Sequence, residues 1–129
     1  MIGLHHVQLA APVGGEDAAR SFWVDGLGLA EVDKPEALRA KGGCWFRATD
    51  RGRVTAEIHI GIEEPFAPAR KAHPALVVGD PTALDTLAVR LRATGFTVDE
   101  RERTTFEGYL RFHTVDPFGN RVEVLARLA

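Results

Sequence analysis

The chain has 129 residues, 45% of them hydrophobic, with a formal charge of −2 and an isoelectric point near 6.2. A chain of this length suits a single domain with its own core, because it can bury about two-thirds of its unfolded surface. The small net charge gives no electrostatic reason to expect nucleic acid or an anionic membrane as a partner.

The first half of the chain predicts a strand, a helix and three further strands. Residues 3–11 alternate between apolar and polar and end at Pro12, whereas residues 16–25 carry apolar side chains at helical spacing. The later elements are strands at 29–32, 42–47 and 54–62 and a turn or short helix at 35–40. In the last of these strands, Glu57 and His59 lie on the face opposite the apolar side chains.

The second half predicts the same order again. After a connecting segment at 63–71, Asp80 and Pro81 suit the N-cap and first position of a helix that ends at Gly95. The strands of this half are expected at 72–78, 96–99, 109–115 and 120–128. A turn at 116–120 leads into the last strand, where Glu123 alternates with apolar neighbours.

Similar residues recur at a nearly constant spacing in the two halves. His73 follows His6 by 67 positions (73 − 6), and Glu123 follows Glu57 by 66 (123 − 57). A duplicated unit too small to close its own core is expected to pair with its copy. We therefore predict an α+β fold of two tandem βαβββ modules, residues 1–64 and 72–129, with a cleft between their sheets.

These features resemble the glyoxalase/bleomycin resistance/dioxygenase superfamily, also called vicinal oxygen chelate proteins. The resemblance covers nearly the whole chain, and its carriers are residues 4–9, 22–29, 72–78 and 116–123. It implies a mixed sheet that curls around a central cavity. In metal-dependent members, the first and last strands of each module each supply one ligand. The matching positions in this sequence are His6, His59, His73 and Glu123.

The chemistry of these side chains supports a metal site. Neutral imidazoles and a carboxylate suit Zn²⁺, Ni²⁺, Fe²⁺, Mn²⁺ or Co²⁺ and leave positions open for water or two substrate oxygens. Each residue taken alone is better explained as a structural or solvated side chain. Their common placement on inward faces, at repeat-related positions, favours a metal site.

Two assignments stay open within this set. The spacing of the repeat selects Glu57 in the fourth strand, whereas the pattern of the family selects His59; we take His59 as the ligand and Glu57 as a reserve ligand or general base. His5 shares a face with apolar neighbours and is expected to pack toward the helix. His113 is expected to be structural or exposed, and not a ligand.

Four further residues are expected to line the cavity: Trp45, Arg47, Tyr109 and Arg111. They offer aromatic area for an apolar substrate and guanidinium groups for a carboxylate or phosphonate. Glu123 and Glu57 are the candidate catalytic residues.

Three functional classes follow from the resemblance. The first is a lyase, isomerase or dioxygenase that uses a divalent metal to hold adjacent oxygens of a small substrate. The second is a metal-free drug- or metabolite-binding protein of the bleomycin-resistance type, and the third is a fosfomycin-type thiol transferase, for which the resemblance suggests His6, His59 and Glu123 as its triad.

The remaining expectations concern assembly and location. The open sheet edges predict a homodimer. The single cysteine, Cys44, excludes an internal disulfide and, with no signal-peptide pattern or membrane span, predicts a cytoplasmic protein.

Overall fold

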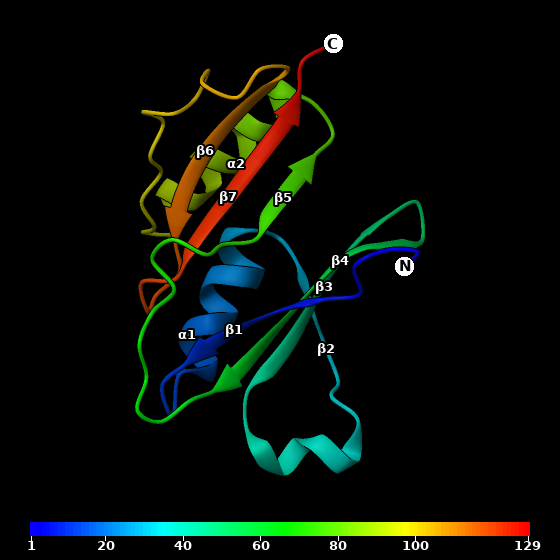
Figure 1. Ribbon diagram of the computed structural model, residues 1–129, viewed down its shortest axis with the longest axis vertical. Coiled ribbons are helices and arrows are strands. Elements are labelled where there is room, and N and C mark those ends of the chain that lie inside the picture. Colours follow the sequence, from blue (N-terminus) through cyan, green and yellow to red (C-terminus); the bar gives the residue numbers. More distant parts are fainter.

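The computed structural model describes residues 1–129, which form two modules with one mixed sheet each (Figure 1). In the first sheet the order is β1-β4-β3-β2; β1 and β4 are parallel and the other neighbours antiparallel. Its strands are β1 (Val7–Ala11), β2 (Ala30–Val32), β3 (Cys44–Asp50) and β4 (Arg53–Ile62), and the 3-10 helix η2 (Glu36–Lys41) joins β2 to β3. The predicted order of this half is confirmed.

One helical segment connects β1 to β2. The α-helix α1 (Glu16–Arg20) continues directly as the π-helix η1 (Ser21–Gly26). At its end, the Leu27 N–H donates to the carbonyl oxygen of Phe22 at 2.9 Å, the five-residue spacing that defines a π-turn. Phe22 and Trp23 on this wider turn are completely buried. The predicted helix over residues 16–25 is confirmed.

The second module has a three-stranded sheet in the order β5-β7-β6. Its elements are β5 (Ala75–Val78), α2 (Pro81–Ala93), β6 (Tyr109–Val115) and β7 (Arg121–Arg127). The Asp80 carboxylate accepts a hydrogen bond from the Ala83 N–H at 2.8 Å, as expected of an N-cap. Leu84 and Leu91 on α2 are completely buried, so the predicted helix is confirmed.

The strand predicted at residues 96–99 is absent, and this prediction is wrong. Only Asp99 pairs with β6, through backbone hydrogen bonds in both directions with His113. The ring of Phe96 turns toward the first module and meets Phe22 edge to face at 5.1 Å. This packing between modules outweighs the local alternation, and the second sheet keeps three strands.

The first strand of each module begins later than predicted, at Val7 and at Ala75. His6 and His73 therefore lie just before their strands. His5 is exposed, and its Nδ1 lies 2.9 Å from Nδ1 of His6. The prediction that His5 packs toward the helix is wrong, because the strand whose face would direct it there starts two residues later.

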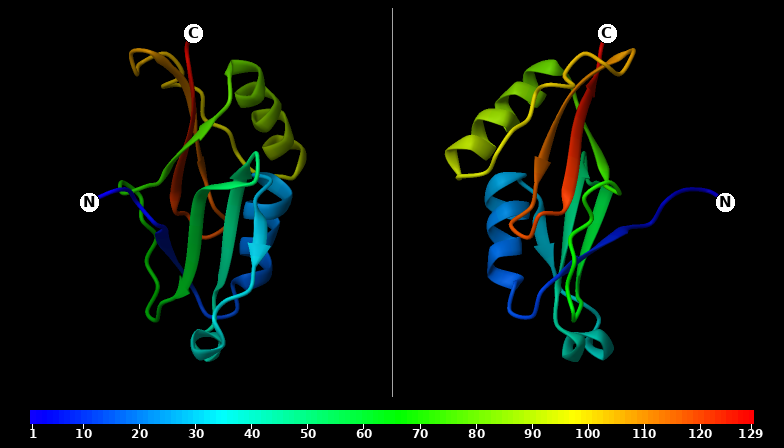
Figure 2. Two further views of the ribbon diagram at one scale, coloured as in Figure 1. Left: turned by 90° about the vertical axis from the view of Figure 1, so that its right-hand side faces the viewer. Right: turned by 60° about the vertical axis from the view of Figure 1, so that its left-hand side comes forward.

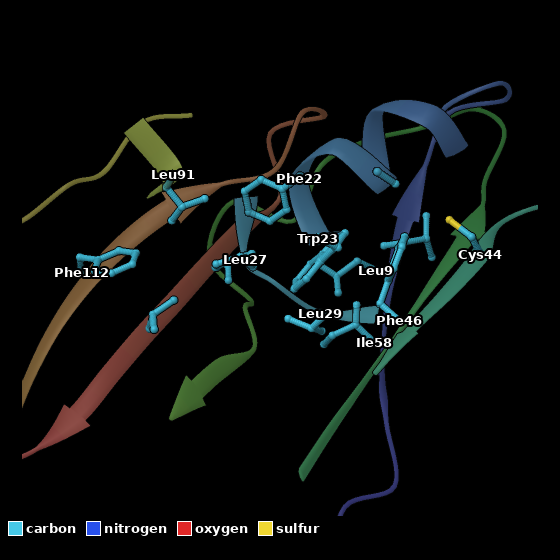
Figure 3. Packing of buried hydrophobic residues seen from close by; sticks show 14 of the residues in the cluster. Leu9, Phe22, Trp23, Leu27, Leu29, Cys44, Phe46, Ile58, Leu91 and Phe112 are labelled. Atoms are coloured by element: carbon cyan, nitrogen blue, oxygen red, sulfur yellow. The ribbon is translucent and has the colours of Figure 1, made fainter. Parts of the chain in front are cut away.

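Both helices lie on the same side of the two sheets (Figure 2), and α2 contacts η1 across the boundary between the modules. The hydrophobic core fills the space between helices and sheets (Figure 3). The other face of each sheet carries the polar side chains of interest, including Glu57, His59 and Glu123. None of the helices combines the length and apolar character that crossing a membrane requires.

One buried amide joins the two modules. The Asn120 Oδ1 accepts a hydrogen bond from the Ala69 N–H at 2.9 Å, and its Nδ2 donates to the Ala10 carbonyl oxygen and to Asp116 Oδ2, both at 2.8 Å. The other oxygen of Asp116 accepts from two backbone N–H groups inside the turn. The turn predicted at 116–120 is confirmed, and it also fixes β1 against the last hairpin.

Candidate metal centre

Glu123 lies among two histidines and an arginine on the polar face of the second sheet, with 5% of its side chain exposed. Its Oε2 is 3.0 Å from Nε2 of His73 and 3.8 Å from Nε2 of His113. Its Oε1 accepts a hydrogen bond from Nη1 of Arg111 at 3.1 Å. Metal-ligand atoms of His73, His113 and Glu123 all lie within 4.8 Å of one another. We call these four residues the β7 cluster.

The surroundings of the β7 cluster favour a charged carboxylate and a neutral imidazole. Burial alone would raise the pKa of Glu123, but hydrogen bonds from Arg111 and His73 hold it below its usual range. Burial lowers the pKa of His113, so its ring is neutral at neutral pH and has a lone pair available. A carboxylate and two imidazoles form a donor set that divalent transition ions accept.

His113 was expected to be structural or exposed, and the structure places it, buried, beside His73 and Glu123. His113 is directly opposite Glu123 in the antiparallel pair of β6 and β7. Strand parity was the signal that pointed there, because side chains two residues apart share a face and Arg111 was already expected in the cavity.

A second group of polar side chains surrounds Glu57 on β4 in the first module. Its Oε2 accepts a hydrogen bond from Nε of Arg47 at 3.1 Å, and its Oε1 lies 3.0 Å from Nε2 of His59. The hydrogen bond with His59 lowers the pKa of Glu57, and Arg47 adds to this against the effect of burial. Burial lowers the pKa of His59 itself. The two candidates for the fourth strand thus lie side by side and bind each other.

Three aromatic rings stack in this first-module group. The ring of His59 lies 3.7 Å from that of Trp45, with an interplanar angle of 2°, and 3.9 Å from that of His6, with an angle of 15°. Two parallel neighbours at such distances must cover opposite faces of the imidazole. The plane of His59 is therefore fixed. We call Trp45, Arg47, Glu57, His59 and His6 the β4 cluster.

A cavity of about 320 Å³ brings residues of both modules together, since His6, Glu57 and His73 all line it. His59 and Glu123 are not among its lining residues. Within one chain the four predicted ligands are therefore divided: His73 and Glu123 belong to the β7 cluster, and His6 and His59 to the β4 cluster.

The remaining predicted residues have other surroundings. Tyr109 lies at the opposite end of β6, where its ring meets Phe106 at 4.9 Å and its hydroxyl accepts a hydrogen bond from Arg127. Burial raises the pKa of Cys44 to about 11, which agrees with its prediction as a buried apolar residue. A separate cavity of about 440 Å³ between the modules has no titratable side chain in its lining.

Comparison with known families identifies the fold. The sequence model of the Glyoxalase/Bleomycin resistance protein/Dioxygenase superfamily matches residues 3–124. The chain belongs to this superfamily. The resemblance seen in the sequence is confirmed, and with it the α+β fold built from two related modules.

Solved structures of the superfamily's fold agree with this assignment. A crystal structure described as a glyoxalase family protein from Bacillus anthracis is 40% identical, with a TM-score of 0.85 over 99% of this chain and 97% of that one. The fosfomycin resistance protein FosX from Listeria monocytogenes is 19% identical, with a TM-score of 0.73 over 99% and 95%. Lactoylglutathione lyase from Agrobacterium tumefaciens is 22% identical, with a TM-score of 0.70 over 98% and 94%. At 19% and 22% identity, the last two structures show only that the fold is shared. A comparison with curated protein sequences found no match.

Proposed function

We propose that the protein is a metal-dependent enzyme that binds a small substrate through two adjacent oxygens, as a lyase, isomerase or dioxygenase. The observation that carries this proposal is the β7 cluster. It places two imidazoles and a buried carboxylate within 4.8 Å of one another, in a chain whose superfamily includes metal-dependent enzymes. Zn²⁺, Ni²⁺, Fe²⁺, Mn²⁺ and Co²⁺ all accept such donors.

The two oxygens of Glu123 have different partners, which suits the binding of an ion. Arg111 occupies one oxygen of Glu123, and the other oxygen faces both histidines. The carboxylate is thereby oriented before any ion binds, as expected of a ligand held by neighbouring hydrogen bonds. We include His6 as a further ligand because it shares a cavity with His73, and His59 because the family pattern selects it.

A bound ion would polarise the substrate oxygens and stabilise negative charge on them. We assign the transfer of a proton to Glu57, which is ionised and lines the same cavity as His6 and His73. Arg47 and His59 each hold one of its oxygens, so the carboxylate has a fixed orientation. Proton transfer by a positioned carboxylate contributes typically about 10²–10⁴-fold to a rate.

A homodimer is part of this proposal. The chain exposes 8064 Å², whereas a compact monomer of its mass exposes about 6,700 Å². The excess is larger than the roughly 800 Å² that each partner buries in a standard interface. Ile2 and Leu4 in the projecting N-terminal segment are among the exposed apolar side chains that a second copy can cover.

Metal uptake tests the proposal directly. Protein stripped with a chelator and then supplied with each of the five ions is expected to bind about one ion per chain, measured by elemental analysis and calorimetry. Glu123→Gln, His73→Ala and His113→Ala should each weaken binding strongly. Glu100→Gln is the control, because this carboxylate is part of exposed ion pairs only. Equal uptake by the wild type and Glu123→Gln would contradict the proposal.

Two further variants test the ligands that lie in the β4 cluster. Loss of affinity in His6→Ala or His59→Ala would place that residue at the ion. Unchanged affinity would limit the ligand set to the β7 cluster.

A metal-free binding protein is the second candidate, and one observation favours it. Each buried glutamate already has an arginine partner, so neither requires an ion to balance its charge. Absence of metal uptake in the wild type would make this the better account.

A further inference from the structure

A polar pocket of about 360 Å³ lies at the end of β6, beside the β7 cluster. We call it the arginine pocket. Its lining includes Arg70, Asp99, Arg101, His113 and Arg121. Three guanidinium groups therefore face one acidic side chain.

The charges in the arginine pocket do not balance. Arg101 binds Asp99 through both carboxylate oxygens, so these two residues neutralise each other. Arg70 and Arg121 have no ion pair and no side-chain hydrogen bond in the structure. Two positive charges are therefore left without a partner, and guanidinium groups match the geometry of carboxylates and phosphates.

The backbone holds these two arginines next to each other. The Arg121 N–H donates to the Ala69 carbonyl oxygen at 2.9 Å, and the Ala69 N–H donates to Asn120 at 2.9 Å. Residue 70 is thus tied to the start of β7 at neighbouring positions. An anion that binds here needs to order little more than the two side chains, which favours affinity.

We propose that the arginine pocket binds an oxyanion, a carboxylate or a phosphate-type group, through Arg70 and Arg121. His113 belongs both to this pocket and to the β7 cluster. A molecule can therefore hold its anionic end in the pocket and its reacting end at the cluster. The conclusion that the substrate is an anionic small molecule rests on the proposed function, whereas the binding of an anion in the pocket does not.

Titration of metal-free protein with inorganic phosphate and with acetate tests the proposal by calorimetry and thermal unfolding. We expect saturable binding that Arg121→Gln or Arg70→Gln weakens by about tenfold or more, as for hydrogen bonds to a charged group. Arg53→Gln is the matched control, because Arg53 is exposed like Arg70 and unpaired like both arginines, but lies on β4. Tighter binding of phosphate would indicate a phosphate-type ligand, and tighter binding of acetate a carboxylate.

Binding of neither anion, or equal weakening by Arg53→Gln, would overturn the proposal.

Glu123→Gln keeps this test independent of the metal proposal. The variant should still bind the anion, since Glu123 does not line the arginine pocket. Anion binding that persists when metal uptake fails would support the pocket and reject the metal centre. Metal uptake without anion binding would do the reverse.

Discussion

Asn120→Ala tests the link between the two modules. The amide is 1% exposed and makes three hydrogen bonds: with the Ala69 N–H, the Ala10 carbonyl oxygen and the Asp116 carboxylate. Two neutral bonds at about 1 kcal/mol each and one to a carboxylate at about 1.5–3 kcal/mol give a loss of about 4 kcal/mol. This is a large part of the roughly 5–15 kcal/mol that stabilises a typical domain.

Urea unfolding measures this loss and shows where it acts. Both tryptophans, Trp23 and Trp45, lie in the first module, so their fluorescence reports that module, whereas circular dichroism reports both. In Asn120→Ala the two transitions should separate, because the second module loses its tie to β1. Asn120→Asp, which places a carboxylate against that of Asp116, should destabilise at least as much. A loss below about 1 kcal/mol with coincident transitions would refute this account of the amide, since that is the value of a single ordinary bond.

Three further predictions concern titration, packing and assembly. Burial lowers the pKa of His59 and His113, so the unfolded chain binds protons that the folded chain does not. Stability of the metal-free protein should therefore fall as the pH drops below about 6.5, and further below about 4.3 as the two glutamates they contact also protonate; a urea midpoint that is constant from pH 8 to pH 5 would contradict this. Leu84→Asp should cost about 3–5 kcal/mol because it buries an unpaired charge, whereas Val89→Asp on the exposed face of α2 should cost little; equal melting temperatures for the two variants would show that the helix face is misassigned. Size-exclusion chromatography with light scattering should give the mass of a dimer, and a monomer at micromolar concentration would remove that part of the proposal.

Most of the fold was predictable because it depends on local pattern. The spacing of Leu84 and Leu91, with Asp80 before them, is enough to define α2. The prediction of a strand at 96–99 failed because Phe96 is positioned by a ring in the other module, and the local sequence does not show this contact. Late strand starts at Val7 and Ala75 likewise depend on which neighbours are available for pairing.

The candidate site was predictable where the repeat or the alternation of a strand decided the matter. Glu57 and Glu123 lie on the polar faces, as their strands required. The place of His113 beside Glu123 was not expected, although parity with Arg111 pointed to it. Whether His6 and His59 join Glu123 depends on how modules meet, within a chain or between chains, and local sequence does not carry that information.

The two glutamates show how a duplicated unit can diverge at a single register position. Arg47 is directly opposite Glu57, whereas His113 is directly opposite Glu123, and the arginine of the second half lies two residues earlier along its strand. Both copies keep one arginine for their carboxylate. In the first module, Arg47 occupies the position opposite the glutamate, and Trp45 lies two residues earlier on the same strand. In the second module, the arginine lies two residues before the facing position, and that position holds His113, whose pKa is lowered by burial. A shift of the arginine by two positions thus keeps the ion pair with the glutamate and adds an imidazole beside it, without disturbing the sheet beneath.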